Sequence, residues 1–183
     1  MSSHHIIRED QEPALLIIDT HTIEFELVQE LLEWSPTVMV TEQSLTEVLS
    51  WGIKIDIVIA HDESFSILST SLVDQSPVKL ISYNHKEEAL STALYFLMAS
   101  KQKAVNIIAT EPLKSFESFP SLDISVFQSG KRWSFIRNGL YEKWFPAGRT
   151  VYVSPSNGRP DIKTERDGIV SINREKGFWV SEE

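Results

Sequence analysis

The stretch 51–64, WGIKIDIVIAHDES, contains a helix end, a short strand and a polar cluster in succession. Gly52 follows residues at helical spacing, and glycine is common just after the last turn of a helix. The mainly apolar residues 55–60 then predict a buried strand. Polar residues follow at once: His61, Asp62, Glu63 and Ser64. Because open α/β sheets bind ligands at the carboxyl ends of their strands, this cluster is a candidate site.

Strands and helices alternate on both sides of this stretch, from residue 14 to about residue 110. Continuous apolar runs predict further strands at 14–19, 37–40, 78–83 and 105–110. Apolar residues at helical spacing predict helices at 23–34 and 44–52, and a longer helix before the last strand. The alternation predicts an α/β fold whose doubly wound, mostly parallel sheet is covered by helices on both faces.

Local motifs predict how three of these helices begin. Ser44 is followed three residues later by Glu47, which is typical of a capping box. Asn84 is predicted to cap the long helix. After the first strand, the predicted cap of the next helix is one of three residues: Asp19, Thr20 or Thr22.

The pattern changes after Pro112, where short strand-like runs are separated by turn residues. These runs lie at 123–128, 132–137, 150–155, 168–173 and 178–183. They predict a second, smaller antiparallel β domain. The predicted organisation is a flexible N-terminus at 1–13, an α/β domain at 14–115 and a β-rich domain at 116–183.

Composition narrows the possible partners. The chain has 26 acidic and 17 basic side chains, a formal net charge of −9, which disfavours nucleic acids and anionic membranes as partners. Cysteine is absent, which excludes disulfides, thiolate metal sites and cysteine nucleophiles. No apolar run approaches the roughly 20 residues needed to span a bilayer, and the start lacks the pattern of a secretory signal. A cytoplasmic protein is therefore expected.

The order of the motifs resembles the thiamine pyrophosphokinase family. The corresponding stretch of that family reads LGIxPDxxIGDFDS, and five residues match it: Gly52, Ile53, Asp56, Ile59 and Ser64. Upstream, VTEQSL at 40–45 aligns with the family's strand into DGGA. Downstream, HKEEALSTAL at 85–94 aligns with its KDxTD motif. The resemblance covers residues 14–110 and extends only loosely into the β-rich half.

The resemblance implies an activity, cofactors and an assembly. Members of the family transfer a diphosphate from ATP to thiamine and release AMP, and they are homodimers. Such a transfer depends on Mg²⁺ to neutralise charge on the phosphoryl oxygens, and Mg²⁺ prefers several hard oxygen ligands. The implied ligands are therefore Mg²⁺, ATP and a thiamine-like small molecule.

The chain departs from the family where those ligands would bind. Both glycines of DGGA are replaced, by Gln43 and Ser44. The aspartates of KDxTD are replaced by Lys86 and Ala89, which offer no oxygen to a cation. His61 stands in place of the first aspartate of GDFDS. The family's GGRxDH loop and the C-terminal segment that encloses thiamine are not recognisable, so impaired or lost catalysis is predicted.

Two alternatives stay open at this stage. In a divergent active enzyme, Asp62 and Glu63 are the catalytic and metal-binding residues. The residues then expected to contact the cofactor are Glu42, His61, Ser64 and Lys86. In the other alternative, the chain is a non-catalytic protein-interaction module that uses the aromatic residues of its C-terminal half.

Overall fold

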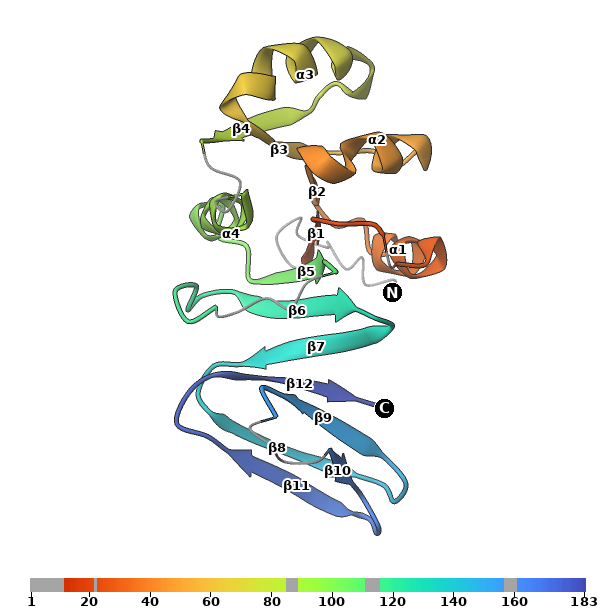
Figure 1. Cartoon of the computed structure of the whole chain (residues 1–183), viewed down its shortest axis with the longest axis vertical. Coiled ribbons are helices and arrows are strands. Elements are labelled where there is room, and N and C mark those ends of the chain that lie inside the picture. The colour runs from red at the N-terminus through yellow and green to blue at the C-terminus, as the bar shows by residue number, and fades with distance from the viewer. Residues whose placement is uncertain (1–11, 22, 85–88, 111–115, 157–160) are drawn as a thin grey trace, which may run out of the picture.

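A computed structural model describes residues 12–21, 23–84, 89–110, 116–156 and 161–183. Within these ranges, ten strands form one mixed sheet in the order β10-β9-β12-β7-β6-β5-β1-β2-β3-β4, and β8 and β11 form a separate two-stranded ribbon (Figure 1). The strands in the α/β part are β1 (Ala14–Ile17), β2 (Val38–Thr41), β3 (Ile57–His61), β4 (Lys79–Tyr83) and β5 (Ala104–Ile108). They run parallel, with β1 between β5 and β2. The predicted strands of this half are confirmed.

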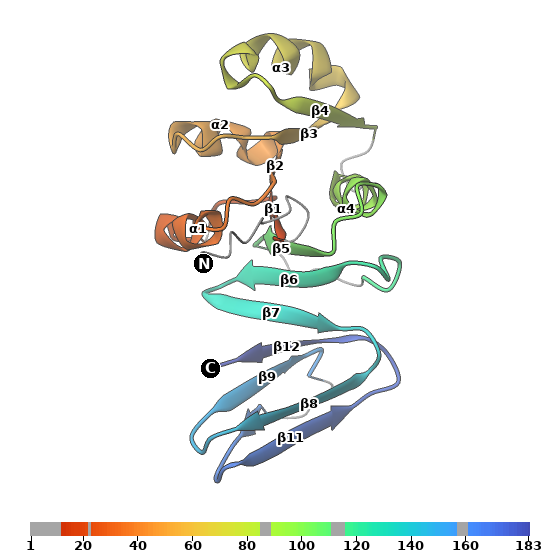
Figure 2. The same ribbon diagram turned by 180° about the vertical axis from the view of Figure 1, so that it is seen from behind.

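Helices cover both faces of the parallel strands, as the alternation predicts. They are α1 (Phe25–Leu32), α2 (Glu42–Ser50), α3 (Phe65–Ser71) and α4 (Ala89–Ala99), with the short 3₁₀ helices η1 (Asp62–Ser64) and η2 (Val73–Gln75). Figures 1 and 2 show α1 and α2 on one side of the sheet and α4 on the other. Alternate residues of β1 separate accordingly, because Leu15 packs with α1 and α2 whereas Leu16 packs with α4.

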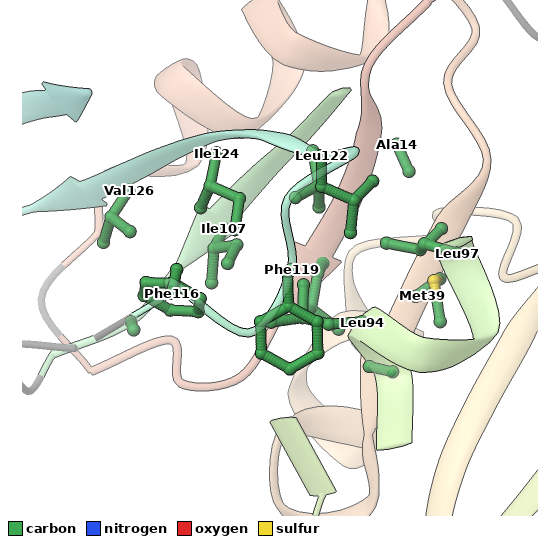
Figure 3. Close-up of a cluster of buried hydrophobic side chains, with 14 of the residues drawn as sticks. Ala14, Met39, Leu94, Leu97, Ile107, Phe116, Phe119, Leu122, Ile124 and Val126 are labelled. Atoms are coloured by element: carbon green, nitrogen blue, oxygen red, sulfur yellow. The ribbon is translucent and has the colours of Figure 1, made fainter. Parts of the chain in front are cut away.

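The α4 face forms the larger core. Leu94 and Leu97 of α4 pack against the sheet, and the connection that follows β5 adds Phe116 and Phe119 (Figure 3). Phe116 is 1% exposed. Burying an aromatic side chain in this way contributes about 1.5–3 kcal/mol. These contacts hold the end of the α/β part against the strands that follow.

The predicted helix starts are partly wrong. Helix α2 begins at Glu42 with Thr41 as its N-cap, and Thr41 makes no side-chain capping bond. Ser44 therefore lies inside the helix, where its buried hydroxyl donates to the Ile18 carbonyl at 2.8 Å. The N-cap of α1 is Glu24, so the predicted caps after β1 are also wrong. The predicted stop at Gly52 is confirmed, because this residue adopts φ +70°, which glycine tolerates best.

The C-terminal half continues the sheet and folds a ribbon over it. Strand β6 (Asp123–Gln128) pairs parallel with β5, and the strands beyond it pair antiparallel. These are β7 (Lys131–Ile136), β9 (Thr150–Ser154), β10 (Ile162–Lys163) and β12 (Phe178–Glu182). The ribbon strands are β8 (Leu140–Phe145) and β11 (Gly168–Asn173). A third core, between ribbon and sheet, includes Phe145, Ile172 and Phe178.

The predicted fold class is confirmed, since a mostly parallel, helix-covered sheet is followed by an antiparallel β part. The two-domain organisation stays a prediction, and the β5–β6 pairing joins both parts in one sheet. Some predicted features lie outside the described residues: 1–11 of the N-terminus, Lys86, and the helix start next to Asn84. Among the described residues, no helix is both long and apolar enough to span a membrane.

Candidate functional site

The parallel strands place their carboxyl ends at one edge of the sheet, where ligands of such folds bind. At this edge the chain leaves β1 toward Asp19, β2 toward Glu42 and β3 toward His61. The connections thus bring polar residues from distant parts of the sequence close together. The hydrogen bonds between them decide which groups remain available to a ligand.

Glu42 is tied to the ends of two neighbouring strands. Its Oε2 accepts the backbone N–H of His61 at 3.1 Å, and its Oε1 accepts the hydroxyl of Tyr83 at 3.3 Å. Burial raises the pKa of Tyr83, and the adjacent Glu42 carboxylate raises it further. Glu42 therefore links β2 to the ends of β3 and β4, and both of its oxygens are engaged in doing so.

The His61 side chain makes a second link. Its Nδ1 accepts the backbone N–H of Glu63 at 3.3 Å, and its Nε2 lies 3.0 Å from the Asn84 carbonyl. An acceptor at Nδ1 requires the neutral ring with its hydrogen on Nε2, which then donates to Asn84. The ring also meets Tyr83 edge-on, with centroids 5.7 Å apart. His61 thereby holds the end of β3 against the end of β4.

The other predicted site residues lie on η1, at the surface. Asp62 and Glu63 are exposed, and the Glu63 side chain retains 90% of its accessible surface. Glu63 Oε2 is 3.9 Å from His61 Nδ1. Ser64 is half-buried and is the N-cap of α3, but its side chain makes no capping bond. The structure thus brings Glu42, His61 and Glu63 to one place.

A second polar group surrounds Asp19, one of the three residues predicted as a cap of the helix after β1. Its Oδ1 accepts the backbone N–H of His21 at 2.9 Å and contacts His21 Nδ1 at 2.5 Å. Its Oδ2 accepts the Thr110 hydroxyl, and the Thr110 carbonyl accepts the amide of Gln128. Burial acts to raise the pKa of Asp19, but these hydrogen bonds outweigh burial and lower it. The bond to Asp19 raises the pKa of His21.

An open pocket of about 340 Å³ lies beside Asp19, between α1 and the ends of β5 and β6. Its lining includes four carboxylates: Asp19, Glu24, Glu26 and Glu30. Among the described lining residues there is no lysine or arginine. Such a lining repels a polyphosphate unless cations accompany it.

A more apolar pocket of about 320 Å³ lies on the β part. Its lining combines Trp133 and Trp179 with Val126, Lys131 and Ser154. Trp179 is 7% exposed, and its buried Nε1 has no hydrogen-bond partner among the described residues. Aromatic walls with a few polar groups are typical of sites for small ring-shaped molecules.

No family model matches the sequence, and no curated protein sequence matches it. Solved structures do match. Thiamine pyrophosphokinase from Bacillus subtilis aligns with a TM-score of 0.60 and 9% identity over 93% of this chain and 97% of that one. Thiamin pyrophosphokinase from Candida albicans aligns with a TM-score of 0.57 and 9% identity, over 95% of this chain and 90% of that one. A probable thiamine pyrophosphokinase from Staphylococcus saprophyticus aligns with a TM-score of 0.57 and 12% identity, over 92% of this chain and 97% of that one.

The chain has the thiamine pyrophosphokinase fold. The agreement spans both the α/β part and the β part, so the C-terminal half is closer to the family's architecture than its sequence suggests. The likeness extends to the arrangement of the backbone. It does not extend to the side chains, since about one residue in ten is identical.

The side chains of the described residues are a poor fit to magnesium in this thiamine pyrophosphokinase fold. Within the described ranges, no three acidic or histidine side chains converge in a way that could hold a metal ion. Both oxygens of Glu42 accept hydrogen bonds, whereas Asp62 and Glu63 project from η1 into solvent. Mg²⁺ requires several converging oxygens in near-octahedral geometry. Lys86 lies outside the described residues.

Proposed function

We propose that the chain is a thiamine pyrophosphokinase-like protein in which diphosphate transfer from ATP to thiamine is impaired or lost. The observation that supports this most directly is the state of Glu42. Its carboxylate aligns with the acidic residue of the family's DGGA motif, yet it serves as an internal acceptor for His61 and Tyr83. A carboxylate that must release two hydrogen bonds before it binds a cation is a weakened ligand.

The surroundings of Asp19 support the same proposal. ATP carries several negative charges, and the pocket at this end of the sheet is lined by carboxylates. Two unit charges at 4 Å repel by roughly 4 kcal/mol near a protein surface. Without a well-held cation, a triphosphate binds here at a considerable electrostatic cost.

An assay of AMP release tests the loss of catalysis. The purified chain is incubated with thiamine, ATP and Mg²⁺, with the Bacillus subtilis enzyme as the active control. We expect AMP and thiamine diphosphate to stay at the level of a blank without protein. Formation of thiamine diphosphate at a rate comparable to the control would refute the proposal.

We further propose that the pocket between Trp133 and Trp179 binds a thiamine-like ring. The Trp179 ring is packed against Phe116 and Phe135, so the face available for stacking is that of the half-buried Trp133, and Ser154 and Lys131 add polar groups to the lining. Titration with thiamine should quench tryptophan fluorescence in a saturable way. Trp133→Leu should abolish the saturable change, whereas Trp34→Leu, at a residue that is 65% exposed and outside the pocket lining, should preserve it. Saturation that survives Trp133→Leu contradicts the assignment.

Two features remain part of this proposal: a homodimeric assembly and a cytoplasmic location. Both derive from the resemblance and the composition. Sedimentation equilibrium of the purified chain tests the assembly, since a monomer mass at micromolar concentration would contradict it. The AMP assay is informative in either case, because it uses the chain in whatever assembly it forms.

A further inference from the structure

A third pocket lies between the main sheet and the ribbon, away from the strand-end site and from the pocket of Trp133. Its volume is about 370 Å³. Strands β7, β8 and β12 line it with Arg132, Ser134, Tyr141, Lys143, Val180 and Glu182. The charged groups are therefore two cations and one carboxylate.

The one carboxylate of this lining is already satisfied. Glu182 accepts the Tyr141 hydroxyl through Oε1 at 2.6 Å and Lys143 Nζ through Oε2 at 2.5 Å. Burial acts to raise the pKa of Glu182, but these two hydrogen bonds lower it, so the carboxylate stays ionised. Glu182 thus joins the main sheet to the ribbon with both of its oxygens.

Arg132 forms no direct ion pair among the described residues, although its charge acts on the neighbouring Glu182 and helps to lower the pKa of that carboxylate. Since Ser181 pairs with Trp133, the register of β7 and β12 places Glu182 beside Arg132. The guanidinium instead donates to the Ser125 hydroxyl, through Nε at 3.4 Å and Nη2 at 3.2 Å. It lies 5.8 Å from the Phe127 ring, which helps to fix its plane.

The lining of the pocket offers more hydrogen-bond donors than acceptors. A guanidinium carries five N–H groups and an ammonium three, so about three donors of Arg132 and two of Lys143 have no partner among the described residues, and both side chains are exposed. Ser134 adds a hydroxyl to the same lining. The lining therefore has a surplus of donors and of one positive charge, and its complement is a group with acceptors only.

We infer that this pocket binds a small oxyanion of the phosphate type, held by Arg132 and Lys143. An arginine fork recognises two oxygens of one phosphate, and a lysine adds a point charge. The chain's overall negative charge opposes distant attraction, but screening limits that effect to about 10 Å at ordinary ionic strength. Carboxylates share part of this chemistry, so the experiment includes them.

Calorimetric titration of the full chain with inorganic phosphate, and separately with succinate, tests the inference. We expect saturable phosphate binding in the millimolar range or tighter, and weaker binding of succinate. Arg132→Gln should weaken phosphate binding by about tenfold or more, because charge-assisted hydrogen bonds are lost. Lys163→Gln removes one exposed cation outside this pocket and should leave the binding unchanged.

Glu182→Gln gives a result of opposite sign. Glutamine keeps an acceptor for Lys143 or Tyr141 but removes the negative charge, so phosphate should bind several-fold more tightly. A purely structural role for this cluster would give no change or a loss of binding in that variant. Circular dichroism verifies that each variant is folded.

Three outcomes would overturn the inference. The first is that phosphate shows no saturable binding, the second that Arg132→Gln and Lys163→Gln lose phosphate affinity equally, and the third that succinate binds more tightly than phosphate. Each is independent of the catalytic assay, because the pocket shares no residue with the strand-end site.

Discussion

Glu42 acts as a structural link between the ends of neighbouring strands. In the family's pattern an acid at this position precedes two glycines that let phosphate approach the backbone. Here Gln43 and Ser44 replace the glycines, and Glu42 accepts hydrogen bonds from the ends of β3 and β4. The loss of both glycines and the hydrogen bonds of Glu42 are consistent with the proposal that diphosphate transfer is impaired.

This role predicts the effect of Glu42→Gln on stability. The substitution converts charge-assisted hydrogen bonds into neutral ones, and we expect the free energy of unfolding to fall by about 1 kcal/mol. Urea denaturation measures this free energy, with EDTA present to remove metal ions. Glu63→Gln is the matched control and should change stability by less than about 0.5 kcal/mol, because Glu63 is exposed. A stabilised Glu42→Gln variant would instead indicate a carboxylate strained for metal binding.

The pair of Asp19 and His21 predicts a pH dependence. The pKa of His21 lies above its ordinary 6.5. The charged ring therefore contributes to the free energy of unfolding below pH 6.5, and this contribution is lost as the pH rises through the raised value. The pKa of Asp19 lies below its ordinary 3.8. The stabilisation that its carboxylate provides is therefore lost only as the pH falls through the lowered value. The pair is fully charged between these limits.

We therefore expect His21→Ala to reduce stability at mildly acidic pH, between about 5 and 6, and to have no effect near pH 9. Urea denaturation of both proteins at the two pH values measures the difference. Added salt should shrink the effect, because His21 is exposed and its charge is screened. A destabilisation of the same size at both pH values would show that the ion pair contributes nothing.

At the scale of elements, the start of α2 is fixed by a tertiary contact. Thr41 and Ser44 both donate their hydroxyls to the carbonyl of Ile18, at 3.0 and 2.8 Å. All of these groups lie near the first strand's end, and the two hydroxyl side chains are 3% exposed. The sequence motif of Ser44 and Glu47 resembles a local cap, but the hydroxyl is used to anchor the helix to β1.

A double-mutant cycle of Thr41→Val and Ser44→Ala tests this anchor. Either hydroxyl alone can satisfy the Ile18 carbonyl, so each single change should cost about 1 kcal/mol or less. The double change leaves the carbonyl without both donors, and it should cost at least about 0.5 kcal/mol more than the sum. Additive costs would mean that the two hydroxyls do not share this acceptor.

Several elements were not predicted from the sequence, and for α3 and β8 the physical reason is clear. Helix α3 consists largely of serine and threonine, which have low helix propensity, and its position depends on Leu68 and Leu72 packing on the sheet. Strand β8 carries a lysine between Glu142 and Trp144, so its alternation is unclear. Its inward side is defined only in the tertiary structure, where Phe145 and Tyr141 pack into the core between ribbon and sheet.

At the scale of the whole molecule, the continuous sheet predicts cooperative unfolding. Strand β6 pairs with β5 on one side and β7 on the other, and Phe116 contacts Trp179 with ring centroids 5.5 Å apart. Each half therefore loses part of its support when the other unfolds. We expect far-UV circular dichroism and tryptophan fluorescence to give coincident urea transitions.

Phe178→Ala extends this test, because it removes a side chain of the ribbon core that is 1% exposed. It should lower the free energy of unfolding by about 3–5 kcal/mol and shift both probes together. Two separate transitions, with only one shifted, would support the two-domain organisation predicted from the sequence.

The sequence by itself determined the alternating strands and helices, the order of the two halves and the family whose fold this chain shares. The strands, helices and order of the halves depend on periodic burial, which is visible among neighbouring residues, whereas the family resemblance depends on short motifs such as residues 51–64. Only the tertiary structure decided what the polar residues do. Whether Glu42 is free or engaged depends on His61 and Tyr83, and these partners come from separate strands. Hydrogen bonds between distant residues leave no periodic pattern, so a motif can keep its place in the sheet while its side chains take other partners.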